Sequence, residues 1–165
     1  MAKKSASGGT PATQALTKAG ISFELLTYTP HDDHRGFGEV AAEELGVEPT
    51  RIFKTLLVDV GAGRPELAVG IVPVAGQLDL KEIAHALGVK KAAMADPRAA
   101  ERSSGYVVGG ISPIGQRTPL RTVIDASAQG FATVVVSAGR RGLQVELAPA
   151  DLAAVTGASF APIGR

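Results

Sequence analysis

Hydrophobic and polar positions follow two periods along the chain, and these periods predict alternating helices and strands. The expected elements are a helix over 10–20, a strand over 21–28, a helix over 37–46, strands over 52–60 and 66–74, helices opening at 79 and 96, strands over 122–125, 132–137 and 143–147, a helix over 149–155 and an extended piece near 160. The first helix carries the clearest signals, with Thr10 as N-cap, Pro11 at the first helical position and Gly20 as its stop.

The order of these elements predicts an α+β fold. The segment 61–65, Gly-Ala-Gly-Arg-Pro, is typical of a hairpin loop, so the strands on either side of it should be antiparallel neighbours. Helices and strands do not alternate strictly, which argues against a doubly wound sheet. We therefore expect a curved, mixed, largely antiparallel and barrel-like sheet flanked by helices, in a single domain over 10–165 after a disordered lead over 1–9.

A lysine interrupts the most apolar of the predicted strands, Ile52-Phe-Lys-Thr-Leu-Leu-Val-Asp-Val60. Side chains alternate between the two faces of a strand, so Lys54 shares the more apolar face with Ile52 and Val58. A lysine is rarely buried without a partner, so Lys54 either extends its charge to solvent at a strand end or stands in a cleft. The strand pattern alone leaves both interpretations open.

Composition excludes several classes of function. The chain has 165 residues, 45% of them hydrophobic, with no uninterrupted apolar run long enough to span a membrane and no signal-peptide pattern, so a soluble, cytoplasmic protein is expected. It has no cysteine, which excludes disulfides, a thiol nucleophile, cysteine-ligated zinc and iron–sulfur clusters. No cofactor is expected.

A formal net charge of +1 argues against a protein that coats DNA. Any contact with nucleic acid should therefore be local, at Lys90-Lys91, at Arg117 with Arg121, or at Arg140-Arg141.

The glycine-rich segment 105–115 holds a serine in a setting similar to that of serine hydrolases. Gly110-Ile-Ser-Pro-Ile-Gly115 is one residue longer than the nucleophile elbow G-x-S-x-G. The residue after Ser112 is Pro113, which has no N–H to donate to an oxyanion. We therefore expect Ser112 to be a hydrogen-bonding loop residue and the loop to present backbone N–H groups to a ligand.

The polar loop His31-Asp-Asp-His34 offers the side chains of a metal site. Structural sites usually draw ligands from separate elements, and the third histidine of the chain, His85, lies on a helix that is predicted to expose it. We expect a solvated loop without metal. A metal-dependent hydrolase that uses His31, Asp32, Asp33 and His34 is the alternative.

Several motifs together resemble the YbaK/EbsC family. They are Phe53-Lys-Thr-Leu-Leu57, Val72-Pro-Val-Ala-Gly-Gln-Leu-Asp-Leu80, Met94-Ala-Asp-Pro97, Gly105-Tyr-Val-Val-Gly-Gly-Ile-Ser-Pro113 and Arg141-Gly-Leu-Gln-Val-Glu-Leu147, and they occur in the family's order. The family is similar to the editing domain of bacterial prolyl-tRNA synthetases, and its best-known members are freestanding Cys-tRNA(Pro) deacylases. The resemblance implies an α+β domain with a strongly curved mixed sheet.

The resemblance also implies site residues. Lys54 matches the family's essential lysine, which favours the cleft interpretation. The substrate-binding positions it implies are Tyr28, Phe37, Thr55, the loop residues Gly109, Gly110, Ile111, Ser112 and Pro113, and Gln144. At Gln144 the chain departs from the family, where a deacylase carries aspartate, so the preferred amino acid stays open.

The implied activity is trans-editing, the hydrolysis of the ester in a mischarged tRNA. The substrate implied is Cys-tRNA(Pro), whose own sulfur attacks the carbonyl while Lys54 holds the terminal phosphate or ribose and the glycine loop receives the oxyanion. The partners implied are the aminoacyl 3′ end of tRNA and prolyl-tRNA synthetase, with no membrane and no DNA. The alternatives are Ala-tRNA(Pro) or another mischarged tRNA as substrate, water as nucleophile, and a module that binds tRNA ends without turnover.

Overall fold

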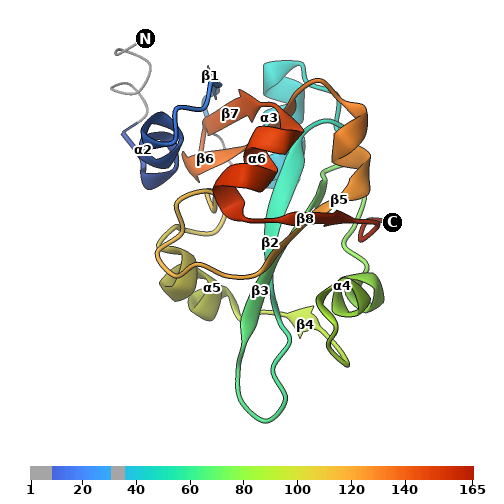
Figure 1. Cartoon of the computed structure of the whole chain (residues 1–165). Coiled ribbons are helices and arrows are strands. Elements are labelled where there is room, and N and C mark those ends of the chain that lie inside the picture. Colours follow the sequence, from blue (N-terminus) through green and yellow to red (C-terminus); the bar gives the residue numbers. More distant parts are fainter. Residues whose placement is uncertain (1–8, 31–35) are drawn as a thin grey trace.

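Helices surround two sheets in the computed structural model, which describes residues 9–30 and 36–165 (Figure 1). The helices are α2 (Pro11–Lys18), α3 (Phe37–Leu45), α4 (Leu80–Leu87), α5 (Pro97–Ser104), the 3-10 helix η1 (Ala126–Gly130) and α6 (Pro149–Thr156). The strands are β1 (Glu24–Thr27), β2 (Phe53–Asp59), β3 (Leu67–Pro73), β4 (Ala93–Met94), β5 (Thr122–Asp125), β6 (Val134–Arg140), β7 (Leu143–Leu147) and β8 (Ser159–Ala161).

The strands form a three-stranded sheet in the order β1-β7-β6 and a five-stranded sheet in the order β4-β2-β3-β5-β8. The first sheet is antiparallel, and the second combines antiparallel pairs around β2 with parallel pairs around β5. A parallel bridge between Ile52 and Val135 joins the two sheets. The α+β class and the mixed, largely antiparallel pairing are confirmed, but the described strands form two sheets and not a closed barrel.

The predicted local signals position the helices. The Thr10 side chain accepts a hydrogen bond from the Thr13 N–H and caps α2, as predicted. The same hydroxyl donates to the Ala138 carbonyl, which fixes the start of α2 to β6. Asp79 and Asp96 cap α4 and α5 in the same manner.

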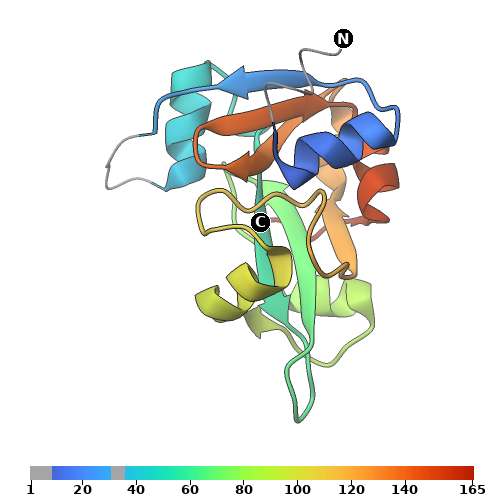
Figure 2. The same cartoon turned by 90° about the vertical axis from the view of Figure 1, so that its left-hand side faces the viewer.

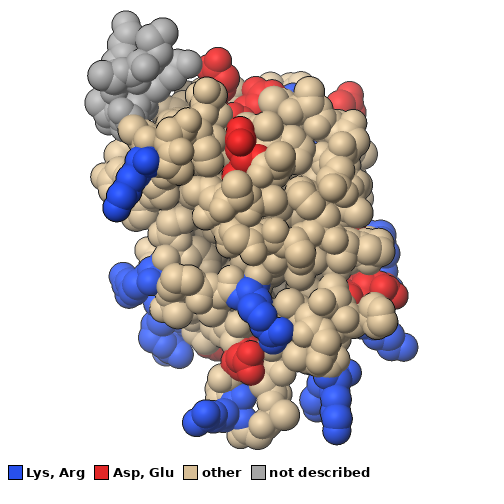
Figure 3. All heavy atoms as spheres, in the orientation of Figure 1, with Lys and Arg blue, Asp and Glu red and all other residues tan. Residues whose placement is uncertain are grey.

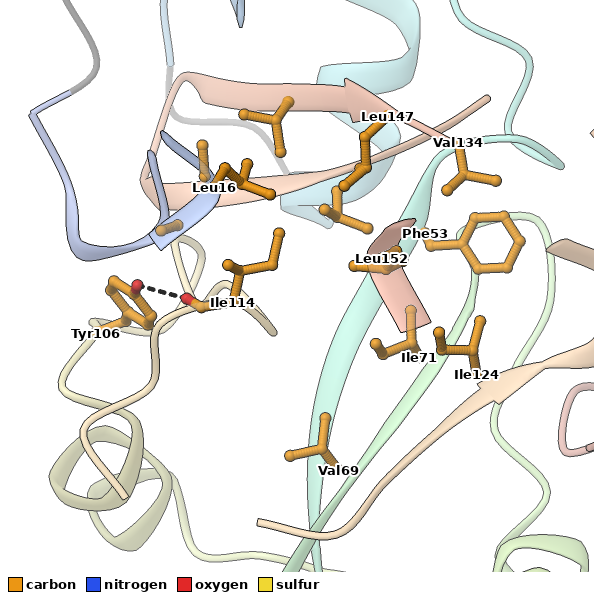
Figure 4. Packing of buried hydrophobic residues seen from close by; sticks show 14 of the residues in the cluster. Leu16, Phe53, Val69, Ile71, Tyr106, Ile114, Ile124, Val134, Leu147 and Leu152 are labelled. Atoms are coloured by element: carbon orange, nitrogen blue, oxygen red, sulfur yellow. Dashed lines mark hydrogen bonds between the residues drawn. The ribbon is translucent and has the colours of Figure 1, made fainter. Parts of the chain in front are cut away.

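The main core lies between the sheets (Figure 4). Phe53 and Leu57 of β2 belong to this core, whereas Val58 of the same strand belongs to a second cluster beneath α4. Strand β2 is therefore buried on both faces. The Tyr106 hydroxyl donates to the Ile114 carbonyl at 2.7 Å, and burial raises the pKa of Tyr106 to about 12. The side chain thus remains a neutral donor that holds the glycine-rich loop.

Short elements escaped prediction. Strand β4 has two residues and the 3-10 helix η1 has five, so neither is long enough to show a period. The predicted lead over 1–9 lies, except for Gly9, outside the described residues. No helix in the described ranges is long and apolar enough to cross a membrane.

A polar network also connects the two sheets. Arg51, which precedes β2, places its Nη1 atom 2.9 Å from Oε2 of Glu146 in β7, and the Thr133 hydroxyl donates to the same oxygen. The hydrogen bond from Thr133 is the main reason that the pKa of Glu146 is lowered, with a smaller contribution from the Arg51 charge.

We expect this lowered pKa to make folding stability depend on pH. A carboxyl group whose pKa is lower in the folded state stabilises the fold above its unfolded pKa of about 4.3, and this contribution is lost as the pH falls through the folded pKa. The wild type should therefore lose about 0.5–1 kcal/mol more than Glu146→Gln in urea unfolding between pH 6 and pH 3. Glu48→Gln, an exposed position, is the control, and equal losses in wild type and Glu146→Gln would contradict the assignment.

Candidate functional site

A cavity of about 350 Å³ lies where the two sheets meet. Its volume is within the range of roughly 300–1,000 Å³ that is usual for small-molecule sites. One wall is the start of α3, another is the segment of β4 and α5 from Met94 to Pro97, and the glycine-rich loop and strands β2, β6 and β7 complete it. The predicted positions among its lining residues are Tyr28, Phe37, Lys54, Thr55, Gly109, Ile111 and Gln144.

The cavity runs along an open stretch of the edge of β2. Strand β3 pairs with β2 over its whole length. On the other side, β4 pairs only with Val58 and Asp59, and β6 reaches β2 only through the bridge at Ile52. The edge between these contacts has no strand partner among the described residues, which explains why consecutive residues of β2 all line the cavity.

Thr55 presents three unsatisfied polar groups at this edge. Its Oγ1 atom is buried and has no hydrogen-bond partner within the described part of the chain. The Leu57 carbonyl accepts from the Ala95 N–H on the open side, and backbone groups two residues apart in a strand point to the same side. The Thr55 N–H and carbonyl therefore face the opening, where the described residues offer them no partner. Buried polar groups without partners are rare, and a bound ligand would satisfy them.

Lys54 lies beside Thr55 and is half-buried. It lines the cavity, and its side chain forms no hydrogen bond or ion pair with any residue in the described ranges. Glu39 also lines the cavity, but no ion pair joins it to Lys54, and an unpaired ammonium group in a cleft is suited to bind an anionic ligand group such as a phosphate. Lys54 is the second residue of β2, so it lies near a strand end and also lines the cavity.

The rim of the cavity is held by Arg141, from the turn between β6 and β7. Its guanidinium lies 4.6 Å from the ring centroid of Phe37 and donates two hydrogen bonds to the Val108 carbonyl, the shorter at 2.8 Å. One side chain thus connects the start of α3 to the glycine-rich loop. Phe37 remains 43% exposed, so its ring is accessible at the mouth.

The part of the cavity formed by β6 and β7, called the floor here, carries two neutral polar side chains. Gln144 of β7 lies directly opposite Ser137 of β6, and both line the cavity. Gln144 is only 6% exposed, and its side-chain amide makes no hydrogen bond to a described residue. An amide without a protein partner offers a donor and an acceptor to a ligand and adds no charge.

The glycine-rich loop presents only part of its backbone to the cavity. The Gly110 N–H donates to the Val107 carbonyl, and Ser112 is fully buried, with its hydroxyl accepting from the Ile114 N–H. The N–H groups of Gly109 and Ile111, which line the cavity, have no hydrogen-bond partner among the described residues. These two amides are therefore available to a ligand.

Comparison with known proteins agrees with this geometry. The model of the aminoacyl-tRNA editing domain matches residues 32–155. The chain belongs to the YbaK/EbsC family of aminoacyl-tRNA editing domains. It is 38% identical over 163 residues to a protein of Enterococcus faecalis (strain ATCC 700802 / V583) named "Putative Cys-tRNA(Pro)/Cys-tRNA(Cys) deacylase EbsC", covering 99% of this chain and 98% of the relative.

Two further proteins are similar to this editing-domain protein. The proline–tRNA ligase of Ralstonia nicotianae (strain ATCC BAA-1114 / GMI1000) is 31% identical over 137 residues, a match that covers 77% of this chain and 23% of the ligase. The crystal structure of a putative trans-editing enzyme for prolyl tRNA synthetase superposes with a TM-score of 0.78 at 24% identity, covering 98% of this chain and 97% of that one. The second likeness concerns the fold alone.

The predicted site residues of this editing domain fall into two groups. Those that line the cavity are Tyr28, Phe37, Lys54, Thr55, Gly109, Ile111 and Gln144, whereas Gly110, Ser112 and Pro113 are buried in the loop and do not line it. Sequence reasoning missed two polar lining residues, Glu39 in the first turn of α3 and Ser137, which ends a predicted strand and is brought to the site by its pairing with Gln144. The proposed metal ligands 31–34 lie outside the described residues, and the rest of the described chain has no group of three metal-ligating side chains.

Gly109 should tolerate no side chain at the rim. Its φ is +92°, and a Cβ there would lie 2.8 Å from the Phe37 ring and 2.8 Å from Nε of Arg141. We expect Gly109→Ala to destabilise the fold by roughly 1–2 kcal/mol and to raise the KM for an aminoacyl-tRNA about tenfold, because the Phe37–Arg141 contact must move.

Gly88→Ala is the matched control for Gly109→Ala. Gly88 also has a positive φ, +71°, but a Cβ there would meet no atom within 4 Å. Thermal unfolding should show a loss of stability in both variants, whereas a raised KM should appear only in Gly109→Ala. A similar KM in the two variants would mean that the rim contact does not contribute to binding.

Proposed function

We propose that this chain is a trans-editing deacylase that hydrolyses the ester between a mischarged amino acid and the terminal ribose of tRNA. The observation that carries the proposal is the cavity that unites an unpaired, half-buried Lys54 with the unsatisfied polar groups of Thr55. The relative named as a deacylase of Cys-tRNA(Pro) and Cys-tRNA(Cys), similar over nearly the whole chain, supports Cys-tRNA(Pro) as the substrate.

Lys54 is assigned to the terminal phosphate or ribose of the tRNA. An ammonium group can bind a phosphate as a point charge, and Lys54 forms no ion pair with a described carboxylate. The Thr55 N–H, with the N–H groups of Gly109 and Ile111, supplies donors for the ester carbonyl oxygen, which becomes negative when the carbonyl is attacked. Binding and charge stabilisation are thus assigned to neighbouring residues of one strand and to the facing loop.

The nucleophile is assigned to the substrate. The chain has no cysteine, and the described lining residues include no serine or threonine within reach of a histidine that could serve as base. In a cysteinyl ester the sulfur attacks its own carbonyl carbon as the thiol proton leaves, the carbon–oxygen bond to the ribose breaks, and the ribose oxygen takes up a proton. The four-membered thiolactone that leaves is then opened by water to give free cysteine.

Gln144 bears on the choice of amino acid. Where the family's deacylase carries aspartate, this chain places a neutral amide opposite Ser137. The amide can donate to or accept from a small side chain without repelling or attracting charge. This floor suits the uncharged cysteine side chain, and it leaves Ala-tRNA(Pro) as the second candidate substrate, with water as the nucleophile.

The partner proposed is prolyl-tRNA synthetase. The related ligase carries a similar unit within its own chain, so this chain would act on the same aminoacyl-tRNA after its release or within a complex with the synthetase. Co-purification of this chain with the synthetase, in the presence and absence of tRNA(Pro), tests the association.

The function itself is tested by the release of amino acid from purified Cys-tRNA(Pro), Ala-tRNA(Pro) and correctly charged Pro-tRNA(Pro). We expect release from Cys-tRNA(Pro) well above the spontaneous rate and none from Pro-tRNA(Pro). Binding of these tRNAs without release above the spontaneous rate would favour the non-catalytic tRNA-end module. Activity that is lost with chelator and restored by metal would favour the metal-dependent alternative.

A further inference from the structure

Charge is distributed unequally over the face of the molecule drawn in Figure 3. Lysine and arginine side chains gather on its lower half, around α4, α5 and the hairpin of β2 and β3, whereas carboxylates are more frequent near the top. In Figure 2, α3 and α5 lie above and below the glycine-rich loop that lines the cavity. The α5 wall of the cavity therefore lies in the half of the molecule where these cations gather.

The wall formed by β4 and α5 carries an excess of cations. We call Lys90, Lys91, Arg98, Arg102 and Arg117 the basic tract. All five side chains are exposed, and none forms an ion pair or hydrogen bond with a residue in the described ranges. Exposed cations that are not neutralised by the protein's own carboxylates are free to bind external anions.

The basic tract adjoins the mouth of the cavity. Met94 and Pro97 line the cavity. Lys91 is three residues from Met94, a distance of at most roughly 11 Å along the chain, and Arg98 directly follows Pro97. Arg98 and Arg102 are four residues apart on α5 and so share a face of the helix. Arg117 continues the tract, because its Cβ atom would lie 3.4 Å from a Cβ at Gly105, which ends α5.

Two carboxylates lie within the same segment, but both are engaged by the backbone. Asp96 accepts from the Ala99 N–H as the cap of α5, and Glu101 accepts from the Val108 N–H in the glycine-rich loop. Their oxygens are thus directed to structural hydrogen bonds, and neither forms an ion pair with the tract. The tract retains more positive than negative charge.

The opposite wall, at the start of α3, carries a carboxylate. Glu39 is exposed and lines the cavity, so it disfavours an anion on that side of the mouth. We therefore expect a polyanion that enters the cavity with one end to extend over α5, where the unpaired cations lie.

We propose that the basic tract binds the sugar–phosphate backbone of the acceptor arm of tRNA and thereby sets the direction from which the aminoacyl end enters the cavity. The inference rests on the proposed function, since it takes tRNA as the substrate. Phosphate contacts carry no sequence information and position the ligand. The tract therefore contributes affinity and orientation but does not distinguish one tRNA from another.

The test is the binding of an uncharged tRNA transcript, measured by fluorescence anisotropy at several salt concentrations, so that no chemistry is required. Arg98→Ala/Arg102→Ala and Lys90→Ala/Lys91→Ala each remove two charges from exposed positions of the tract. Lys18→Ala/Arg165→Ala removes the same net charge at exposed positions of α2 and the C-terminus and is the control.

We expect each tract variant to bind about tenfold more weakly at low salt, and the slope of log Kobs against log salt to become less steep by about 2, while the control remains close to wild type. Wild-type binding that is undetectable at low salt, or equal losses in the tract and control variants, would overturn the proposal. If tRNA binding depends on the basic tract but the wild type deacylates no ester, the proposal that the tract binds tRNA is retained and the proposed deacylase function is rejected.

Discussion

Replacing Lys54 with methionine should lower kcat/KM for the aminoacyl ester by about 10²–10³-fold. This is the loss usual when one charged or preorganised donor is removed from a site that stabilises developing negative charge. Methionine retains most of the apolar stem, and Lys54 forms no ion pair or hydrogen bond with the described residues that the substitution could break. The fold should therefore persist, which circular dichroism and thermal unfolding would establish before release of amino acid is measured.

Two further variants sharpen this result. Lys18→Met, at an exposed position of α2, removes the same charge outside the cavity and should leave activity unchanged. Lys54→Arg keeps the charge but replaces a compact ammonium by a planar, larger group, so partial activity with a raised KM is expected. If a folded Lys54→Met variant retained more than about a third of wild-type kcat/KM, Lys54 would not act on the ester or its phosphate.

The long periodic segments were predictable because a full helix face or strand shows its period in the sequence. The helix that opens at Phe37 and the strand 122–125 were placed well, and the hairpin between β2 and β3 is antiparallel as expected. Strand β4 has only two residues, so it left no period to detect. Because β4 was not predicted, the open edge of β2 could not be predicted either, since that edge lies between the contacts of β2 with β4 and with β6.

Site residues could be predicted only where they belong to a motif that resembles the family. Alternation places Lys54 and Thr55 on opposite faces of a strand, so the sequence pattern alone separates them. They line one cavity because that cavity follows the open edge of β2, where both faces are reached. Ser137 was not predicted as a site residue for a related reason. It lies at the cavity because it pairs with Gln144, and the register between two strands cannot be derived from the sequence of either strand alone.

The largest difference in deacylation rate between aminoacyl esters should come from the reactivity of the attached amino acid and not from its contacts with the protein. If the sulfur of the cysteinyl group is the nucleophile, it is held next to the carbonyl within the same molecule, and intramolecular attack has a high effective concentration. The protein then needs only to orient the ester and to stabilise the oxyanion with the Thr55, Gly109 and Ile111 amides. We expect Cys-tRNA(Pro) to be deacylated at least about 100-fold faster than the same tRNA charged with serine or 2-aminobutyrate.

The seryl and 2-aminobutyryl esters separate the effect of side-chain size on binding from the effect of side-chain nucleophilicity on the rate. Serine replaces the thiol by a hydroxyl, a far weaker nucleophile near neutral pH, and 2-aminobutyrate replaces it by a methyl group of similar size that cannot attack. Rates are measured as release of radiolabelled amino acid, with the spontaneous loss from each ester subtracted. The enzymatic rate for the cysteinyl ester should also rise as the pH approaches the ordinary thiol pKa of about 8.5, because the thiolate is the attacking form. Deacylation of the 2-aminobutyryl ester at the rate of the cysteinyl ester would assign the attack to water, and the unpaired groups of Thr55 would then be the first candidates to hold that water.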